Sequence, residues 1–446
     1  MSLEYSLISR SITKNLEKTT KKNNGIYFTP PKTILKNIDF LNPYLQNIKS
    51  VLEPSCGSCE YITKLDNLFN LDFTCIEKNE EIYNQIKTYE KDNIKILNSD
   101  FINYDIENKF DLIIGNPPYF VIQKNIVSNE YYKYFEGRPN IFIIFIIKSL
   151  KMLKENGILS FVLPNSFINS SYYNKARKYI YTNYKILNII DCKDDNYIET
   201  KQETIIFIIQ NKLQESKEND KFSLNINNNI IFGCEDNIKK IRELYANSTT
   251  LKNLGINIKV GNVVWNQVKD ILTDDNSKTR LIYSSDIENN KLVMKKYKNN
   301  EKKNYINKKG INEPLFVINR GYGTGKYNFS YTIINCDNLE YLVENHLLIV
   351  YYNENISKEL LLDKYNKIKK SFENIKTKQF IELYFGNNSI NTSEILNVLP
   401  IYDIWKAGKA TPFPFFHLIS ILRVFPDSVF ALYLDKDGSF SYDLIT

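Results

Sequence analysis

Hydrophobic and polar residues alternate along the first half of the chain in a pattern typical of an α/β domain. Short apolar runs bounded by turn-forming residues predict strands, and longer segments with a helical spacing of apolar residues predict helices. The predicted strands are 48–53, 71–76, 94–97, 110–115, 158–163, 186–191 and 203–210. The predicted helices are 3–16, 32–40, 140–154 and 172–181, and another opens after residue 60. This alternation predicts an open sheet with helices on both faces.

The alternation fades at a charged segment, 212–221, which is the best candidate for a linker. Short strands are predicted beyond it at 256–265, 280–284, 315–319 and 347–352, and 380–399 resembles the last segment of the same domain. From Lys406 onwards asparagine disappears, and proline and phenylalanine gather at 412–416. We therefore divide the chain into residues 1–215, residues 216–405 of mixed α+β character, and a tail, 406–446, to which we assign no role.

Composition and charge narrow the function only slightly. The net charge of +7 is a modest basic excess, compatible with nucleic acid but not diagnostic of it. No apolar run is long enough to span a membrane, and the polar first 24 residues lack the apolar core of a secretory signal. We therefore expect a cytoplasmic protein with no membrane partner.

The six cysteines are scattered, which is typical of a reducing compartment. Cys56 and Cys59 form a C-x-x-C pair, but no second pair and no nearby histidine completes a zinc site. The sequence therefore predicts no metal.

The strongest chemical signal lies at the end of the predicted strand 110–115, where the apolar run stops at Asn116-Pro117-Pro118-Tyr119. Each proline holds the residue before it extended, so the Asn116 amide oxygen and the Pro117 carbonyl become acceptors in a fixed geometry. Together with the ring of Tyr119, they suit a planar group that carries an NH2, such as adenine, cytosine or a glutamine amide. Hydrogen bonds from both N–H groups would free the nitrogen lone pair for attack.

Acidic and small residues follow the other predicted strands. The strand 48–53 ends at Glu53 and leads into the small-residue turn 54–60, and the next two strands end at Glu77 and at Asp100-Phe101. Open α/β sheets bind ligands at the carboxyl ends of their strands. An acidic residue about twenty positions after such a turn can bind ribose hydroxyls, so these residues predict a nucleoside ligand.

In their order along the chain, these motifs resemble those of gamma-class N6-adenine DNA methyltransferases, and most of all the TaqI-like enzymes of type II restriction–modification systems. The residues that carry the resemblance are Phe28-Thr29-Pro30, Glu53-Pro54-Ser55-Cys56-Gly57, Glu77, Asp100-Phe101 and Asn116-Pro117-Pro118-Tyr119. The resemblance covers residues 25–215 and continues more loosely over 255–401, as a target recognition domain. It implies a Rossmann-like sheet that binds S-adenosylmethionine (SAM). It also implies double-stranded DNA as substrate, and it allows a restriction endonuclease that acts on the same site without direct contact.

The resemblance also implies a role for each matched residue. Thr29 would contact the amino-acid end of SAM, and the methionine pocket would be lined by Glu53, Pro54, Ser55 and Cys56. Glu77 would bind the ribose hydroxyls, and Asp100 would bind the adenine amine. Phe101 would contact the cofactor ring, and Pro118 would lie beside the cofactor as well. The flipped-out target adenine would be held by Asn116, Pro117, Pro118 and Tyr119, with Tyr197 stacked on its other face. Cys59 occupies a position where the family usually has a second glycine, and a larger side chain there would narrow the cofactor pocket.

Arg320 and Lys326 flank a glycine-rich segment in a chain with only 15 glycines. Such a loop lies close to a phosphate backbone in many proteins, and an exposed hairpin is the alternative. We assign both cations to DNA binding. The segment is not a Walker loop, because Lys326 lacks the following Ser or Thr.

Several other functions fit part of the pattern. A protein glutamine methyltransferase of the release-factor type shares the Asn-Pro-Pro-Tyr loop, but those enzymes have no large domain after the catalytic one. A cytosine-N4 methyltransferase usually has serine where Asn116 stands. A homologue that binds DNA but is catalytically weak, with Cys59 as its lesion, is the non-enzymatic alternative. A fused nuclease is disfavoured, because Glu301-Lys302-Lys303 is a weak match to a nuclease core.

Overall fold

The computed structural model describes residues 4–105, 107–212, 218–297, 299, 301–320, 329–335, 339–354, 356–385 and 390–402, and the backbone of two strands near the C-terminus. Contacts divide the chain into two compact units, 1–402 and 403–446. In the second unit, β20 (Val429–Leu434) and β21 (Phe440–Ile445) form an antiparallel hairpin. The remainder of the predicted tail lies outside the described residues.

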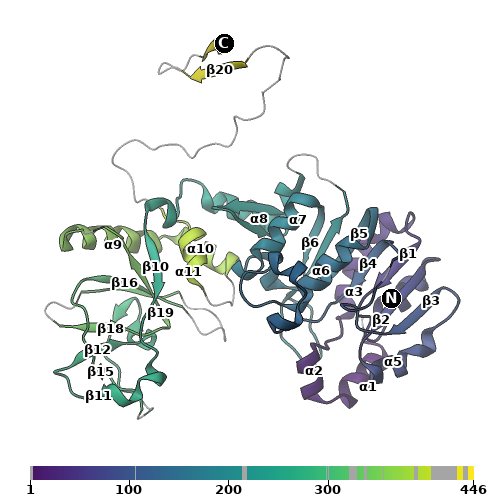
Figure 1. The fold of residues 1–446 in the computed structure, drawn as a ribbon, viewed down its shortest axis with the longest axis horizontal. Coiled ribbons are helices and arrows are strands. Elements are labelled where there is room, and N and C mark those ends of the chain that lie inside the picture. The colour runs from purple at the N-terminus through teal and green to yellow at the C-terminus, as the bar shows by residue number, and fades with distance from the viewer. Residues whose placement is uncertain are drawn as a thin grey trace. The chain divides into compact units, whose positions relative to one another are not determined.

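The first half of the chain forms a seven-stranded sheet in the order β3-β2-β1-β4-β5-β7-β6 (Figure 1). Its strands are β1 (Ser50–Glu53), β2 (Asp72–Glu77), β3 (Ile94–Asn98), β4 (Phe110–Gly115), β5 (Leu153–Pro164), β6 (Lys185–Asp191) and β7 (Thr204–Gln210). The strands β1 to β5 pair in parallel, and β7 runs antiparallel between β5 and β6. The predicted α/β class is confirmed, with a Rossmann-like sheet.

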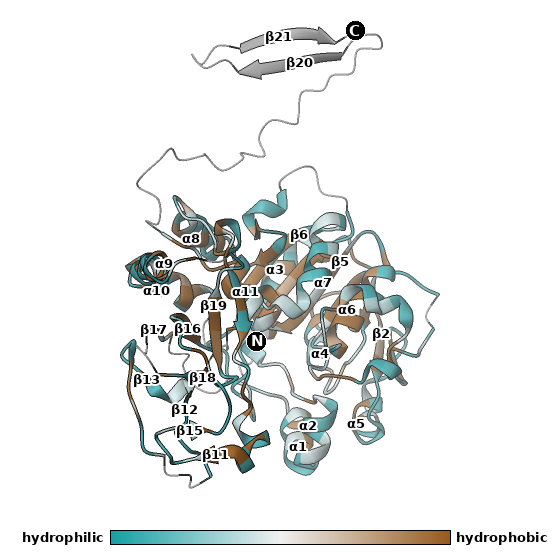
Figure 2. Ribbon diagram, turned by 60° about the vertical axis from the view of Figure 1, so that its left-hand side comes forward, coloured by the Kyte–Doolittle hydropathy of each residue, from teal (hydrophilic) through white to brown (hydrophobic). Residues whose placement is uncertain are grey.

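Helices cover both faces of the sheet, because successive strand residues point to opposite faces. On β4, Leu112 and Ile114 pack on one face and Ile113 on the other. The helices on the first face are α1 (Leu7–Asn15), α3 (Pro31–Leu45), α4 (Glu60–Asp66) and α5 (Glu80–Ile86), with α2 (Lys18–Asn24) beside them. The other face is covered by α6 (Ile141–Lys151) and α7 (Asn174–Asn183). Figure 2 shows hydrophobic residues concentrated along the strands.

The later region contains two further four-stranded sheets. The first sheet has the strand order β10 (Asn257–Val260), β19 (Leu347–Tyr351), β16 (Leu315–Asn319) and β17 (Tyr331–Ile334). The second sheet has the order β11 (Leu272–Thr273), β15 (Tyr305–Ile306), β12 (Thr279–Ile282) and β18 (Tyr341–Val343). Smaller elements are the hairpins β8 (Ser223–Ile226)–β9 (Asn229–Phe232) and β13 (Ile287–Glu288)–β14 (Lys291–Leu292), and the helices α8 (Glu235–Tyr245), α9 (Lys358–Phe372), α10 (Ile375–Tyr384) and α11 (Thr392–Asn397). This region has the mixed α+β character expected of it.

The hairpin β8–β9 packs against the core of the seven-stranded sheet. Phe222, Ile230 and Phe232 belong to the core on the α6–α7 face. The buried Arg177 guanidinium on α7 donates from Nε to the Ile230 carbonyl at 2.5 Å. The core of the sheet therefore extends beyond residue 215, where we predict the domain boundary, and that boundary stays a prediction. Of the predicted linker, residues 213–217 lie outside the described residues, and 218–221 form a short 3-10 turn.

The longest described helices, α3 and α9, have 15 residues each. Within the described part of the chain, no helix has the length and hydrophobicity to cross a bilayer.

Candidate active site

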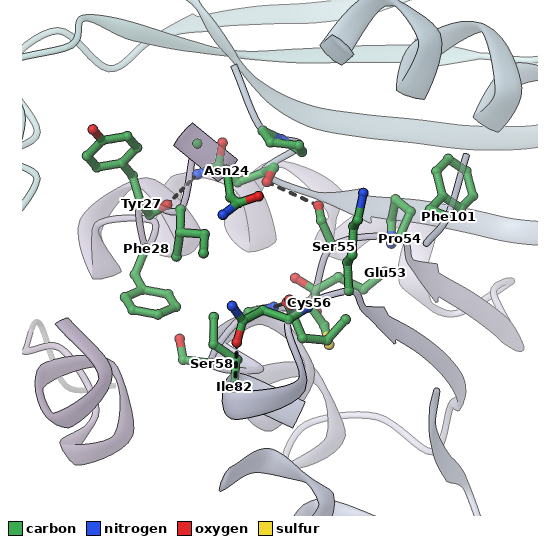
Figure 3. Close-up of a pocket in the computed structure, with 18 of the residues that line it drawn as sticks. Asn24, Tyr27, Phe28, Glu53, Pro54, Ser55, Cys56, Ser58, Ile82 and Phe101 are labelled. Carbon is green, nitrogen blue, oxygen red and sulfur yellow. Dashed lines mark hydrogen bonds between the residues drawn. The ribbon is translucent and has the colours of Figure 1, made fainter. Parts of the chain in front are cut away.

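A cavity of about 350 Å³ opens across the carboxyl ends of β1, β2 and β4. Figure 3 shows Tyr27 and Phe28 on one side of it, with Ser55, Glu53 and Phe101 across from them. Ten predicted site residues line the cavity: Thr29, Glu53, Pro54, Ser55, Cys56, Glu77, Asp100, Phe101, Asn116 and Pro118. Residues separated by up to 89 positions in the sequence are thus brought into one site, as expected from their positions at strand ends.

Four other predicted site residues do not line the cavity. Pro117, Tyr119 and Tyr197 are not in the cavity wall, although Asn116 and Pro118 on either side of Pro117 are. Arg320 lies at the end of β16, where its N–H donates to the His346 carbonyl and its carbonyl accepts from Ile390. Lys326 lies outside the described residues.

The turn after β1 is held close to the end of β2. The Cys56 N–H donates to the Ile76 carbonyl at 2.9 Å. Gly57 has a φ of +50°, and a Cβ there would lie 3.2 Å from the Phe28 ring, so glycine is required for both backbone and space. Cys59 also has a positive φ, +59°, yet its side chain is fully buried in the core on the α3–α4 face and does not line the cavity. The expected narrowing of the pocket by Cys59 is therefore not seen in the cavity wall.

Glu53 brings an unpaired carboxylate oxygen to the cavity. The residue is 3% exposed, and its Oε2 has no hydrogen-bond partner among the described residues. Burial raises the pKa of Glu53 well above its usual range, and the nearby Cys59, Glu60 and Glu77 raise it further. A buried acceptor of this kind is costly unless a cation or a donor reaches it.

Glu77 is held in place by the backbone around the cavity. One of its oxygens accepts from the Gly57 N–H at 3.0 Å and the other from the Asn79 N–H at 2.7 Å. Burial raises the pKa of Glu77 to about 7, although these two bonds oppose the shift. A carboxylate oxygen accepts more than one hydrogen bond, so both oxygens still have capacity for the hydroxyls of a ligand.

Asp100 and Phe101 form the wall beyond β3. Asp100 accepts from the Ile102 N–H at 3.1 Å and pairs with Lys78 at 2.9 Å. The Phe101 ring is 1% exposed and lies 4.9 Å, centroid to centroid, from Phe145 on α6. The two rings give this wall an apolar surface that suits the face of a heterocycle.

The Asn116 side chain is fixed at both ends. Its Nδ2 donates to the Tyr27 carbonyl at 3.1 Å, and its Oδ1 accepts from the Tyr119 hydroxyl at 2.5 Å. The same hydroxyl lies 2.7 Å from the Val162 carbonyl, and with one proton it donates to only one of these two acceptors at a time. The Tyr119 ring meets Phe142 edge to face at 6.0 Å. In this state Tyr119 packs against the core and occupies the acceptor of Asn116.

Tyr197 is buried behind the catalytic loop. It is 8% exposed, and neither its hydroxyl nor the Thr204 Oγ1 has a hydrogen-bond partner in the described structure. Burial raises the pKa of both Tyr197 and Tyr119, and the nearby Tyr197 raises the pKa of Tyr119 further. Tyr197 is therefore buried in this structure, and its predicted stacking on the target base stays a prediction.

Side-chain contacts hold the N-terminal helices against the turn that follows β1. Local sequence patterns did not indicate these contacts. The Ser9 hydroxyl on α1 lies 2.7 Å from the Ser58 hydroxyl and 2.6 Å from the Glu60 carboxylate. The buried Lys21 on α2 pairs with Glu199 at 2.7 Å. We call residues 4–24 the N-terminal strap.

Several cavity residues were missed by sequence reasoning: Asn24, Gly25, Ile26, Glu60, Tyr61, Phe120, Ile141 and Phe145. Some of them had a signal in the sequence. Phe120 directly follows the Asn-Pro-Pro-Tyr loop, and Ile141 and Phe145 are four residues apart on one face of a helix. Glu60 pairs with Lys64 one helical turn later, but its contacts with Ser6 and Ser9, more than 50 positions away, left no signal in the local sequence.

A Rossmann-like sheet with one reversed strand beside its edge, and an acidic and aromatic cavity at its carboxyl ends, define a SAM-dependent methyltransferase. SAM is its cofactor, and the residues present fit it. The unpaired Glu53 oxygen suits a positive group such as the sulfonium or the ammonium of SAM. Glu77 suits the ribose hydroxyls, and Phe101 with Phe145 suits the adenine ring. No group of His, Cys, Asp and Glu side chains in the described residues could hold a metal ion.

Comparison with known proteins shows what the chain is similar to. Residues 33–198 match the sequence profile of the Eco57I restriction-modification methylases, and the chain is a homologue of type II methyltransferases. It is 25% identical over 394 residues to the type II methyltransferase M.CvrRI of Paramecium bursaria Chlorella virus XZ-6E, covering 87% of this chain and 97% of that one. It is 27% identical to the modification methylase CviBIII of Paramecium bursaria Chlorella virus NC1A, covering 78% and 88%.

Among solved structures, the chain is similar to the methyltransferase subunit of a type I restriction-modification system from Streptococcus thermophilus. The TM-score is 0.37 with 18% identity, and the likeness covers 49% of this chain and 53% of that one.

Proposed function

We propose that the protein transfers the methyl group of SAM to N6 of a flipped-out adenine in duplex DNA, as the modification enzyme of a restriction–modification system. One observation carries the proposal. The Asn116-Pro117-Pro118-Tyr119 loop lies at the carboxyl end of β4, and Asn116 and Pro118 form part of the cofactor cavity wall. An amine held by this loop would therefore face the methyl group of a bound SAM.

The loop would activate the amine by accepting its protons. The exocyclic nitrogen of adenine is a poor nucleophile because its lone pair is conjugated with the ring. Hydrogen bonds to Asn116 Oδ1 and to the Pro117 carbonyl favour a tetrahedral nitrogen in the transition state. Bound SAM would supply the methyl group together with a neutral thioether as leaving group, and the amine would release one proton to solvent as its new N–C bond replaces the S–C bond.

Tyr119 has to release Asn116 before this happens. Its hydroxyl lies 2.5 Å from Asn116 Oδ1 and 2.7 Å from the Val162 carbonyl. By donating to Val162 instead, the hydroxyl remains paired while Asn116 Oδ1 accepts from the incoming amine. Tyr119 would then stack on the base, with Tyr197 on its other face after rearrangement.

The similarity to restriction-modification methylases supports DNA as the substrate rather than a protein glutamine. On this reading, residues 1–215 carry catalysis and 216–405 recognise the target. Arg320 and Lys326 would contact phosphates, and other side chains of this region would read base edges. The enzyme would protect its target from an endonuclease that cuts the same sequence.

Analysis of nucleosides and modified positions in DNA from cells that express the protein tests the proposal. We expect N6-methyladenine in one sequence context, and none in cells expressing Asn116→Ala. N4-methylcytosine would identify the base as wrong. Unmodified DNA together with N5-methylglutamine in cellular protein would replace the proposal by the glutamine alternative.

A further inference from the structure

Between the catalytic loop and α6 the chain forms a long surface segment whose two ends lie side by side at the cavity wall. After Phe120, residues 122–139, here called the excursion, pass over the surface before α6 begins at Ile141. The excursion is closed at its neck by an antiparallel bridge between Val121 and Asn140. The Ile122 N–H donates to the Pro139 carbonyl, and the Ile141 N–H to the Phe120 carbonyl, both at 3.0 Å. Phe120 and Ile141 line the cavity, so the neck is part of the catalytic wall.

The excursion is firmly anchored but exposes apolar side chains. Its inner residues, among them Tyr131, Tyr134 and Phe135, are buried in the core on the α6–α7 face. Ile126 is nevertheless 72% exposed, and Val121 at the neck is 56% exposed. These two side chains are therefore available for contact with another molecule beside the catalytic loop.

Positive charge accompanies these apolar residues. Lys124, Lys133 and Arg138 have no carboxylate partner within the described part of the chain. Glu130 is neutralised by Lys151 at 2.5 Å, which leaves Glu136 as the one acidic residue of the excursion without an ion pair in the described structure. Exposed cations interleaved with apolar side chains suit a polyanion with apolar faces between its charges.

We propose that the excursion contacts the DNA duplex beside the target base, with Lys124, Lys133 and Arg138 on phosphates and Ile126 against the base step that opens. This inference rests on the proposed function, and adds a second DNA contact to the one proposed for Arg320 and Lys326. Because the neck is part of the cavity wall, contact with the duplex would position the catalytic loop directly. Extruding a base costs a few kcal/mol, and apolar side chains that fill an opened step offset such costs in other DNA-binding proteins.

Salt-dependent binding tests the charged part of the surface. The full chain and a Lys124→Ala/Arg138→Ala variant would be titrated onto a fluorescein-labelled duplex of mixed sequence at several KCl concentrations. Loss of two phosphate contacts lowers the slope of log affinity against log salt by about 1.8. The matched control is Lys95→Ala/Lys109→Ala, which removes the same charge near the amino ends of β3 and β4, opposite the site. We expect the control to keep the wild-type slope.

Ile126→Ser tests the apolar part. Leu68→Ser is the control, because Leu68 is exposed and follows α4, which packs on the opposite face of the sheet. Transfer of tritium from labelled SAM into PCR-amplified DNA should fall about tenfold or more in Ile126→Ser and not in Leu68→Ser. SAM affinity should be the same in all variants. Excursion variants that match their controls in both assays would overturn this inference alone. A wild-type chain that binds no duplex would overturn the proposed function as well.

Discussion

Glu53 has a buried carboxyl oxygen without a hydrogen-bond partner among the described residues, and this has a measurable cost. The folded protein holds the Glu53 proton to a higher pH than the unfolded chain, whose value is near 4.5. Above that pH the folded state binds more protons, so Glu53 makes folding less favourable as the pH rises. The groups that face it, Glu60, Glu77 and Cys59, act in the same direction.

The first prediction follows from this sign. Glu53→Gln keeps the shape of the side chain without the charge, so we expect a higher melting temperature than wild type at pH 8 and a smaller gain at pH 5, without SAM. In the same variant SAM affinity should fall roughly 10- to 100-fold, since a charged hydrogen bond contributes about 1.5–3 kcal/mol. Thermal scans and calorimetric titration measure both. Equal shifts at the two pH values would show that the Glu53 proton is not involved.

The second prediction separates Asn116 from Tyr119. Asn116→Ala should lower the methylation rate by a factor of roughly 10² to 10³ with SAM binding nearly intact. Tyr119→Phe removes the hydroxyl that occupies Asn116 Oδ1 but keeps the ring, so it should retain most of the rate. Single-turnover assays compare them, with Tyr119→Ala as the control for loss of the ring. A Tyr119→Phe enzyme as slow as Asn116→Ala would give the hydroxyl a direct role.

Elements were predictable where their cause was local. The strand β4 is observed at Phe110–Gly115, as predicted, because an apolar run stops at two prolines that cannot continue a ladder. The helix α2 was not predicted, since its sequence is polar and only Lys21 is buried. The pairing of Lys21 with Glu199, 178 positions away, has no trace in local patterns. The bond between Tyr119 and Asn116 was hidden for a similar reason: side-chain orientation depends on Phe142 and Val162.

The third prediction concerns the N-terminal strap. Ser9→Ala leaves the buried Glu60 carboxylate with fewer donors, which costs about 1–3 kcal/mol. We expect faster proteolysis within residues 1–24 and weaker SAM binding, because Glu60 lines the cavity. Ser11→Ala is the matched control, an exposed serine on the same helix. Identical cleavage rates in the two variants would show that the Ser9 contacts do not hold the strap.

On the scale of the whole molecule, the structure of the first half was easier to predict from the sequence than that of the second half. The strands of the sheet and the position of the cavity were predictable from apolar runs and from motifs at strand ends, although the strand order was not. The later region has short strands without a distinctive pattern, and only its mixed character was foreseen. The hairpin β8–β9 was not predicted from the sequence. Together with the preceding Phe222, its Ile230 and Phe232 complete the core on the α6–α7 face of the sheet. The Ile230 carbonyl accepts a hydrogen bond from the buried Arg177.

The fourth prediction tests this extension of the core. A fragment of residues 1–233 should bind SAM and unfold at a higher temperature than a fragment of residues 1–215. The shorter fragment exposes apolar surface and leaves the Arg177 guanidinium with an unmet hydrogen bond. Calorimetry on both fragments decides the matter. If the two melt together, the hairpin adds nothing to the stability of the sheet, and residue 215 is the better boundary.

The bridge between Val121 and Asn140 has an implication for how such enzymes diversify. It fixes the distance between the two ends of the excursion independently of what lies between them. Loop-closure entropy rises only slowly, by about 0.6 kcal/mol for each doubling of length. The exposed positions of the excursion can therefore be extended or exchanged with little strain on the catalytic wall, provided that the buried Tyr131, Tyr134 and Phe135 stay in the core. At the neck, one excursion can therefore be replaced by another. Such a replacement would change the DNA surface that the enzyme contacts while its chemistry is kept.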